Sequence, residues 1–260
     1  MGILKGFVGF FCVLVVGNNL LWAQGGGNEL LYQKGLKARE NFQYNEGFAL
    51  FQILLKSDSG NVDYLSNMSY FYSRVGQLQA TEGMRMPYYR TAEYLGLKAI
   101  KVGPNDDEAH FSYVLALGRL NEHASSKQKI NNAKRIKSEL DICLRLNPKH
   151  DGAWHILGVY HRTIAGFNGF EKLAINSLFG GVPEGCTYED AIRCLEKAVE
   201  YRKNYMFHHY DLALTYYERG KPGDKARARE VLKTTLALPN FTQDDPENRK
   251  KCEALLKKVE

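Results

Sequence analysis

The sequence predicts an all-α protein built as a solenoid of about five antiparallel helix pairs. Apolar residues recur every three or four positions through most of the chain, which is the period of an amphipathic helix. Small residues recur in similar sequence contexts at intervals of several tens of residues. Prolines follow two of the helical segments and act as stop signals. With 44% apolar and 25% charged residues, the composition is that of a globular protein rather than a disordered one.

Two segments carry the pattern of a known repeat. The stretch AWHILGVYH places Trp154 and Gly158 at the spacing of a first helix, and AIRCLEKAVEY places Ala191 and Ala198 at the spacing of a second helix. The pattern resembles the tetratricopeptide repeat, which forms two antiparallel helices in 34 residues. The resemblance implies a tetratricopeptide-like helical-repeat solenoid, in which Gly158 and Ala191 lie where paired helices cross.

The spacing between successive repeats exceeds 34 residues by a different amount each time, and each excess can be assigned to a segment of the sequence. The equivalent positions of the second helices are separated by 45, 44, 55 and 37 residues; they are Gly47, Ala92, Ile136, Ala191 and Ala228. We expect insertions between paired helices at 77–90 and 124–133, and an extra helix within 162–187. The pairs then cover 28–60, 62–104, 105–148, 149–203 and 204–240, and a charged C-terminal helix caps the array.

Residues 1–23 form a separate segment that predicts a signal peptide. A short apolar run follows Lys5 and ends before Asn18, which is the length of a signal-peptide core and short for a membrane span. We expect cleavage after Ala23, which leaves 24–260 as one helical-repeat domain without a membrane span. The expected location is the periplasm or the outside of the cell. An uncleaved N-terminal membrane anchor is the alternative.

The sequence shows no motif for catalysis, for a cofactor or for a metal. It contains no G-x-S-x-G, no H-E-x-x-H and no phosphate-binding loop. His208 and His209 are adjacent and diverge by about 100° on a helix, so they are poorly placed to share one metal. Cys143 and Cys194 occupy helical core positions, where cysteine acts as a small apolar residue. The net charge of +6 is dispersed, which argues against nucleic-acid binding. We therefore expect a protein that is not an enzyme and has no cofactor.

Aromatic, arginine and histidine side chains recur on the predicted first helices of the pairs. In such solenoids these helices line the concave face, and aromatic and arginine residues are the types that anchor protein interfaces. We expect this face to bind a protein or peptide partner of some acidic character. The candidate residues are Tyr70, Arg74, Phe111, Arg119, His155, Arg162, Tyr210 and Tyr217. The alternative is that several of them pack against the inserted segments.

The second half of the chain resembles a narrower family. Its motifs are Asn147-Pro148, a Leu-Phe-Gly loop at 178–180, Pro183, and a Thr-Tyr-Glu-x-Ala start of a helix at 187–191. These motifs are similar to those of the regulator of microtubule dynamics family, whose animal members are linked to microtubules and mitochondria. The resemblance implies the repeat fold and the role of an adaptor.

The sequence thus predicts an exported helical-repeat adaptor that binds a protein partner on its concave face. One alternative is an enzyme or carbohydrate-associated protein with its site in the insertion at 162–187, where glycine and aromatic residues gather. The other is an adaptor held at a membrane by its N-terminal segment.

Overall fold

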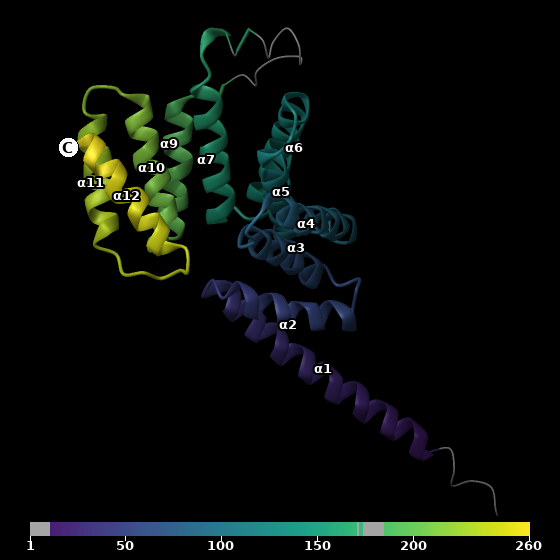
Figure 1. The fold of residues 1–260 in the computed structure, drawn as a ribbon. Coiled ribbons are helices and arrows are strands. Elements are labelled where there is room, and N and C mark those ends of the chain that lie inside the picture. The colour runs from purple at the N-terminus through teal and green to yellow at the C-terminus, as the bar shows by residue number, and fades with distance from the viewer. Residues whose placement is uncertain (1–10, 171, 174–184) are drawn as a thin grey trace, which may run out of the picture.

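The computed structural model describes residues 11–170, 172–173 and 185–260, with side chains from residue 26 onward. Within these residues every regular element is a helix (Figure 1). The helices are α1 (Phe11–Glu40), α2 (Tyr44–Ser57), α3 (Val62–Gln77), α4 (Glu82–Val102), α5 (Asp107–Glu122), α6 (Ser126–Leu146), α7 (Asp151–Ala165), α9 (Tyr188–Tyr201), α10 (Met206–Arg219), α11 (Asp224–Leu236) and α12 (Asp245–Val259).

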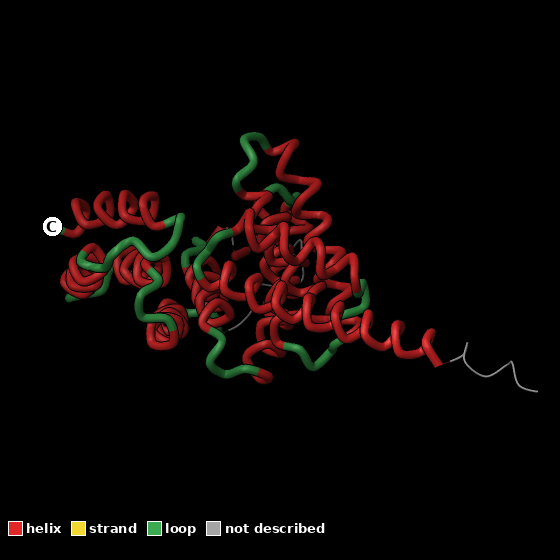
Figure 2. The backbone as a smooth tube through the Cα atoms, turned by 90° about the horizontal axis from the view of Figure 1, so that it is seen from below, coloured by secondary structure: helices red, strands yellow, loops and turns green. Residues whose placement is uncertain are grey.

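The helices stack as consecutive pairs, which confirms the predicted fold class. The pairs are α1/α2, α3/α4, α5/α6, α7/α9 and α10/α11, and each pair packs on the next. Figure 1 shows α7, α9, α10 and α11 standing side by side. The C-terminal helix α12 packs on α10 and α11, and Figure 2 shows it lying beside that pair. It therefore covers the open end of the array, as a capping helix does.

The expected insertions at 77–90 and 124–133 are mostly helical, so that part of the prediction is wrong. Helices α4 and α6 begin at Glu82 and Ser126 and reach 21 residues each. The Thr81 and Ser125 side chains accept hydrogen bonds from backbone N–H groups of the first turns, and Ser125 forms a full capping box with Gln128. These caps satisfy N–H groups that a helix start leaves open, so the extra residues lengthen the helices.

The predicted close helix crossing at Gly158 is present. A Cβ atom there would lie 2.6 Å from Leu195 Cγ and 3.1 Å from the Ala191 carbonyl oxygen. Helix α9, which carries both neighbours, starts at the capping box of Thr187 and Asp190. The extra helix expected within 162–187 concerns mainly 171 and 174–184, which lie outside the described residues.

The buried apolar side chains form two clusters. One extends from the turn between α1 and α2 to the start of α10, and the other joins α9, α10, α11 and α12. Cys143 and Cys194 are buried and free, as the helical pattern predicted. None of the helices that the structure describes is both long and apolar enough to cross a lipid bilayer.

Candidate functional site: a groove along the first helices

The first helices of all five pairs contribute side chains to one groove of about 560 Å³. On α3 the groove residues Tyr70 and Arg74 are four positions apart, and on α5 Phe111, Leu115 and Arg119 repeat the same interval. Side chains at this spacing lie on one face of a helix, so stacking the helices places one such stripe beside the next. The volume is in the range of sites that bind small molecules or short peptide segments.

The structure places six of the eight predicted side chains in this groove. They are Tyr70, Arg74, Phe111, Arg119, His155 and Arg162. The other two, Tyr210 and Tyr217, pack instead against the C-terminal cluster. The groove face of α10 carries Phe207, His208 and Asp211, because α12 covers the side of α10 on which the two tyrosines lie.

Arg39 and Glu108 form an ion pair at the α1 side of the groove. Arg39 Nη2 lies 2.5 Å from Glu108 Oε2, and Arg39 Nη1 donates to Asn67 Oδ1 at 2.9 Å. Burial alone would raise the pKa of Glu108, but Arg39 and the neighbouring His150 lower the pKa of this carboxyl far below its usual range. The Arg39 guanidinium also lies 4.3 Å from the centre of the Tyr70 ring. Both charges are therefore held in place before any partner binds.

Asp211 on α10 organises the opposite side of the groove. Its Oδ1 accepts from Arg162 Nη1 at 2.7 Å, and its Oδ2 lies 2.7 Å from His155 Nε2. Burial opposes the charged form of Asp211, yet His155 and Arg162 lower its pKa below the usual value. The predicted residues His155 and Arg162 are thus joined by a carboxylate on the next repeat, which fixes their orientation.

His208 lies beside this network and is uncharged at neutral pH. Its ring centre is 4.7 Å from that of His155, and its Nε2 lies 2.9 Å from Asp151 Oδ2. Burial lowers the pKa of His208 to about 4, against the opposing effect of Asp151. The groove therefore contains a histidine that stays neutral although the Asp151 carboxylate lies 2.9 Å away.

Apolar side chains form the wall between the charged groups. Leu115 on α5 and Ile156 and Val159 on α7 line the groove and are partly exposed. Gly118 also lines it, and a Cβ atom added there would meet no atom within 4 Å. The position thus faces open space, and the groove has room for the apolar side chains of another chain segment.

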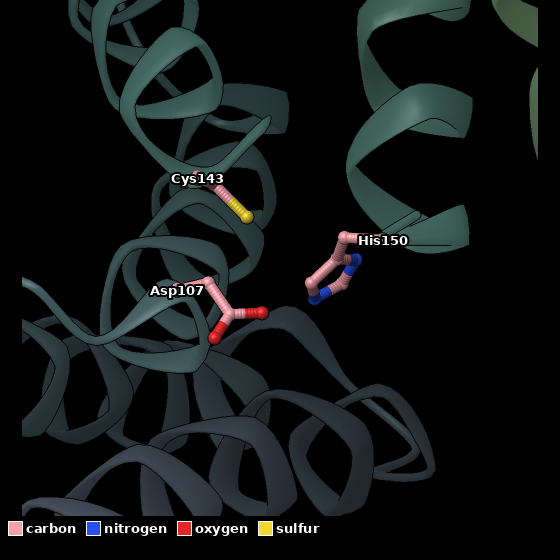
Figure 3. Close-up of side chains that lie close together, drawn as sticks. All are labelled: Asp107, Cys143 and His150. Atoms are coloured by element: carbon pink, nitrogen blue, oxygen red, sulfur yellow. The ribbon is translucent and has the colours of Figure 1, made fainter. Parts of the chain in front are cut away.

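A cluster of Asp107, Cys143 and His150 lies near the groove, with one potential ligand atom of each residue within 4.8 Å of the others (Figure 3). His150 caps α7, because its Nδ1 accepts from the Ala153 N–H at 3.1 Å. That bond places the ring proton on Nε2, so neither nitrogen keeps a free lone pair for a metal. Burial also raises the pKa of the Cys143 thiol, so the thiol is protonated. The cluster as arranged is a structural contact between α5, α6 and α7.

Sequence reasoning missed the acidic half of the groove and Arg39. Glu108, Asp151 and Asp211 each pair with a cation from another part of the chain, and such pairs are visible only once the helices are stacked. Arg39 could have been found by selecting residues at the spacing of one helix face in the first repeat, as was done for the other repeats. The alternative site in the insertion lies mainly outside the described residues and stays a prediction.

Comparison with known proteins identifies relatives over most of the chain. A sequence model of the family "Regulator of microtubule dynamics protein 1-3" matches residues 31–260. Regulator of microtubule dynamics protein 2 of Mus musculus is 25% identical over 230 residues, which cover 88% of this chain and 55% of that protein. Protein 1 of Bos taurus is 26% identical over 219 residues, or 83% of this chain and 68% of the relative. The chain spans about half the length of the first of these relatives.

Among solved structures, a thermophilic TPR protein of Thermus thermophilus superposes with a TM-score of 0.62 at 15% identity, covering 88% of this chain and 98% of that one. At this identity the likeness concerns the fold alone. It agrees with the tetratricopeptide-like pairing of helices described above.

The expected export to the periplasm or the cell exterior is wrong. The two relatives described above are mammalian proteins named as regulators of microtubule dynamics, and microtubules are polymers of the interior of eukaryotic cells. The expectation depended on an apolar N-terminal stretch, but apolar residues are also what a helix presents to a neighbour. In the structure one helix, Phe11–Glu40, runs across the position after Ala23. Cleavage at that position stays a prediction.

Proposed function

The chain belongs to the regulator of microtubule dynamics protein 1-3 family, and on this premise we propose that it is a scaffold, not an enzyme, that binds a segment of tubulin in its groove. The observation that carries the proposal is the groove itself, to which α1, α3, α5, α7 and α10 all contribute. A surface built from five repeats follows an extended segment along the solenoid, as concave solenoid surfaces do. The family name supplies the microtubule as the structure on which such binding acts.

The composition of the groove supports protein recognition. Tyrosine, phenylalanine and arginine are residue types enriched at protein interfaces, and they occur together in the groove at Tyr70, Phe111 and Arg119. Internal ion pairs such as Arg39 with Glu108 fix several charged side chains beforehand. Fewer side chains then lose freedom on binding, which favours affinity.

A block of the groove at Gly118 tests the proposal. Gly118→Trp would place an indole ring in the open space of the groove, and the helix tolerates the change because glycine is a poor helix former. Gly83→Trp is the matched control, since Gly83 on α4 also has no atom near its added Cβ but does not line the groove. Both variants would be compared with the unchanged protein by co-sedimentation with polymerised tubulin.

The proposal predicts that Gly118→Trp weakens co-sedimentation at least about tenfold, as expected for the loss of one central interface contact. Gly83→Trp should leave it unchanged. Equal co-sedimentation of the two variants, or no co-sedimentation of the unchanged protein, would overturn the proposal. Circular dichroism and thermal unfolding of both variants check that the fold is retained.

A further inference from the structure

Arg74 has no counter-charge within the groove. Five arginines line the groove, and four of them form ion pairs: Arg39 with Glu108, Arg119 with Glu122, Arg162 with Asp211 and Arg202 with Asp151. Arg74 forms no ion pair with any residue that the structure describes, and its buried Nε has no hydrogen-bond partner there. Arginine stays charged at all physiological pH values, so this cation lacks a carboxylate of its own and can pair with one from another molecule.

Three tyrosines surround the Arg74 guanidinium. Its carbon lies 5.4 Å from the ring centres of both Tyr44 and Tyr70. Tyr205 is also close, since Arg74 opposes the rise that burial causes in the Tyr205 pKa. The aromatic faces favour the cation, and the Tyr205 side chain is a hydrogen-bond partner of Arg74, but a tyrosine ring does not neutralise its charge. The nearby acid Asp244 accepts instead from the Tyr44 hydroxyl, at 2.8 Å.

The overall charge of the groove favours a single carboxylate over a polyanion. Its lining holds five arginines and five acids, namely Glu40, Glu108, Glu122, Asp151 and Asp211, so the formal charges cancel when the histidines are neutral. A nucleic acid would bring phosphates close to these carboxylates. One carboxylate at Arg74 meets one uncompensated cation, whose planar fork matches a carboxylate in two parallel hydrogen bonds.

We propose that Arg74 binds the side-chain carboxylate of an aspartate or glutamate in the segment that occupies the groove. The inference rests on the proposed scaffold function and names the chemistry of its partner. Arg74 fixes the register of the bound segment, because it is the groove arginine that the protein leaves without an acid of its own. The apolar wall formed by Leu115, Ile156 and Val159 then takes neighbouring apolar side chains of the same segment.

Three peptide pools test this assignment. All contain random seven-residue peptides; the first has glutamate at the central position and no other acid, and an amidated end. The second replaces that glutamate with glutamine, and the third keeps glutamine but ends in a free carboxylate. Each pool is passed over the immobilised protein and over four variants, and the retained peptides are quantified by mass spectrometry. The variants are Arg74→Gln, Arg74→Lys, Asp244→Asn and Gly118→Trp.

The proposal predicts that the glutamate pool is retained at least about tenfold better than the glutamine pool, the range expected for a charge-assisted bidentate bond. Arg74→Gln should abolish this preference. Arg74→Lys should keep only part of it, because lysine cannot form the fork. Asp244→Asn should raise retention of the glutamate pool, because it removes the acid closest to the site while keeping an acceptor for Tyr44.

Each remaining outcome overturns the inference in a distinguishable way. If both amidated pools are retained equally and Gly118→Trp releases both, the groove binds peptides but Arg74 does not select an acid. If only the pool with the free C-terminal carboxylate is retained, the groove binds the end of a chain rather than an acidic side chain. If no pool is retained, the groove fails as a peptide site, and the proposed function fails with it.

Discussion

The ring of Phe42 stacks on the ring of Tyr205, with centroids 5.2 Å apart and planes 22° apart. Phe42 belongs to the turn between α1 and α2, whereas Tyr205 precedes α10, so the contact joins the first repeat to the fifth. A second link is the hydrogen bond from the Tyr44 hydroxyl to Asp244 at 2.8 Å. In an open solenoid each repeat contacts only its neighbours. Here the two ends meet, and the groove lies between them.

Removing the Phe42 ring should destabilise the whole protein, not only the turn that carries the residue. Phe42 is 2% exposed, so Phe42→Ala should lower the free energy of unfolding by about 3–5 kcal/mol, the usual cost of removing a buried phenylalanine ring. The urea transition should also broaden, because the two ends would unfold less cooperatively. Tyr94→Ala, at a residue 65% exposed, is the control and should change the free energy by less than about 0.5 kcal/mol. A sharp, unshifted transition for Phe42→Ala would show that the ends are not coupled.

Two helix glycines should respond in opposite directions to alanine. A Cβ atom at Gly96 would lie 2.8 Å from the Tyr113 Cα, a backbone atom that has little room to move, so Gly96→Ala should cost about 1–3 kcal/mol. Gly118→Ala meets open space and should stabilise the protein by about 0.5–1 kcal/mol, because alanine favours the helix. Urea denaturation of both variants measures the difference. The helix-crossing account fails if Gly96→Ala is as stable as the unchanged protein.

His208 should make stability fall as the pH decreases from about 6.5 to 4. Burial lowers its pKa to about 4 in the folded state, against about 6.5 when unfolded. Between these two pH values His208 is protonated in the unfolded state but neutral in the folded state. The free energy of unfolding therefore decreases by about 3 kcal/mol as the pH falls from 6.5 to 4. His161 and His209, whose pKa values burial also lowers, act in the same direction. His110 acts in the opposite direction, because Glu139 raises its pKa.

The contribution of His208 can be separated by comparing His208→Gln with the unchanged protein. Glutamine does not titrate and can still donate to Asp151, so the variant should lose less stability than the unchanged protein between pH 6.5 and 4. The measurement is the urea midpoint at several pH values. Parallel pH profiles of the two proteins would rule out the assigned pKa shift.

Two aspartates that accept from cations should differ strongly in their importance. Asp211→Ala leaves Arg162 and His155 without their buried partner and should cost about 3–5 kcal/mol. Asp141→Ala removes an exposed pair with Lys137 at 2.7 Å and should cost at most about 1 kcal/mol. Thermal and urea unfolding compare the two. Equal costs would mean that the Asp211 network adds nothing beyond a surface ion pair.

The fold could be predicted because its determinants are local and repeated. Small residues at helix crossings, such as Gly158, and stop signals such as Pro148 can be recognised in any single repeat. The lengths of α4 and α6 were misjudged, because a longer repeat was interpreted as a longer connection. The caps at Thr81 and Ser125 carried the correct signal.

The site could be predicted only where the spacing of residues along a helix was enough to show which side chains share one helix face. The spacing alone placed Tyr70, Phe111 and Arg162 in one groove. It failed for Tyr210 and Tyr217, because the rotation of α10 depends on α12, which no single repeat encodes. The partners of the arginines, and hence the exceptional position of Arg74, depend on contacts between helices that are far apart in the sequence.

The most direct test of the groove as a binding site is photo-crosslinking to polymerised tubulin. A benzophenone amino acid would replace Leu115, which lines the groove, or Tyr94, which is exposed outside it. The account predicts crosslinks to tubulin from position 115 and none above background from position 94. Crosslinks from position 94 alone, or equally from both, would contradict it.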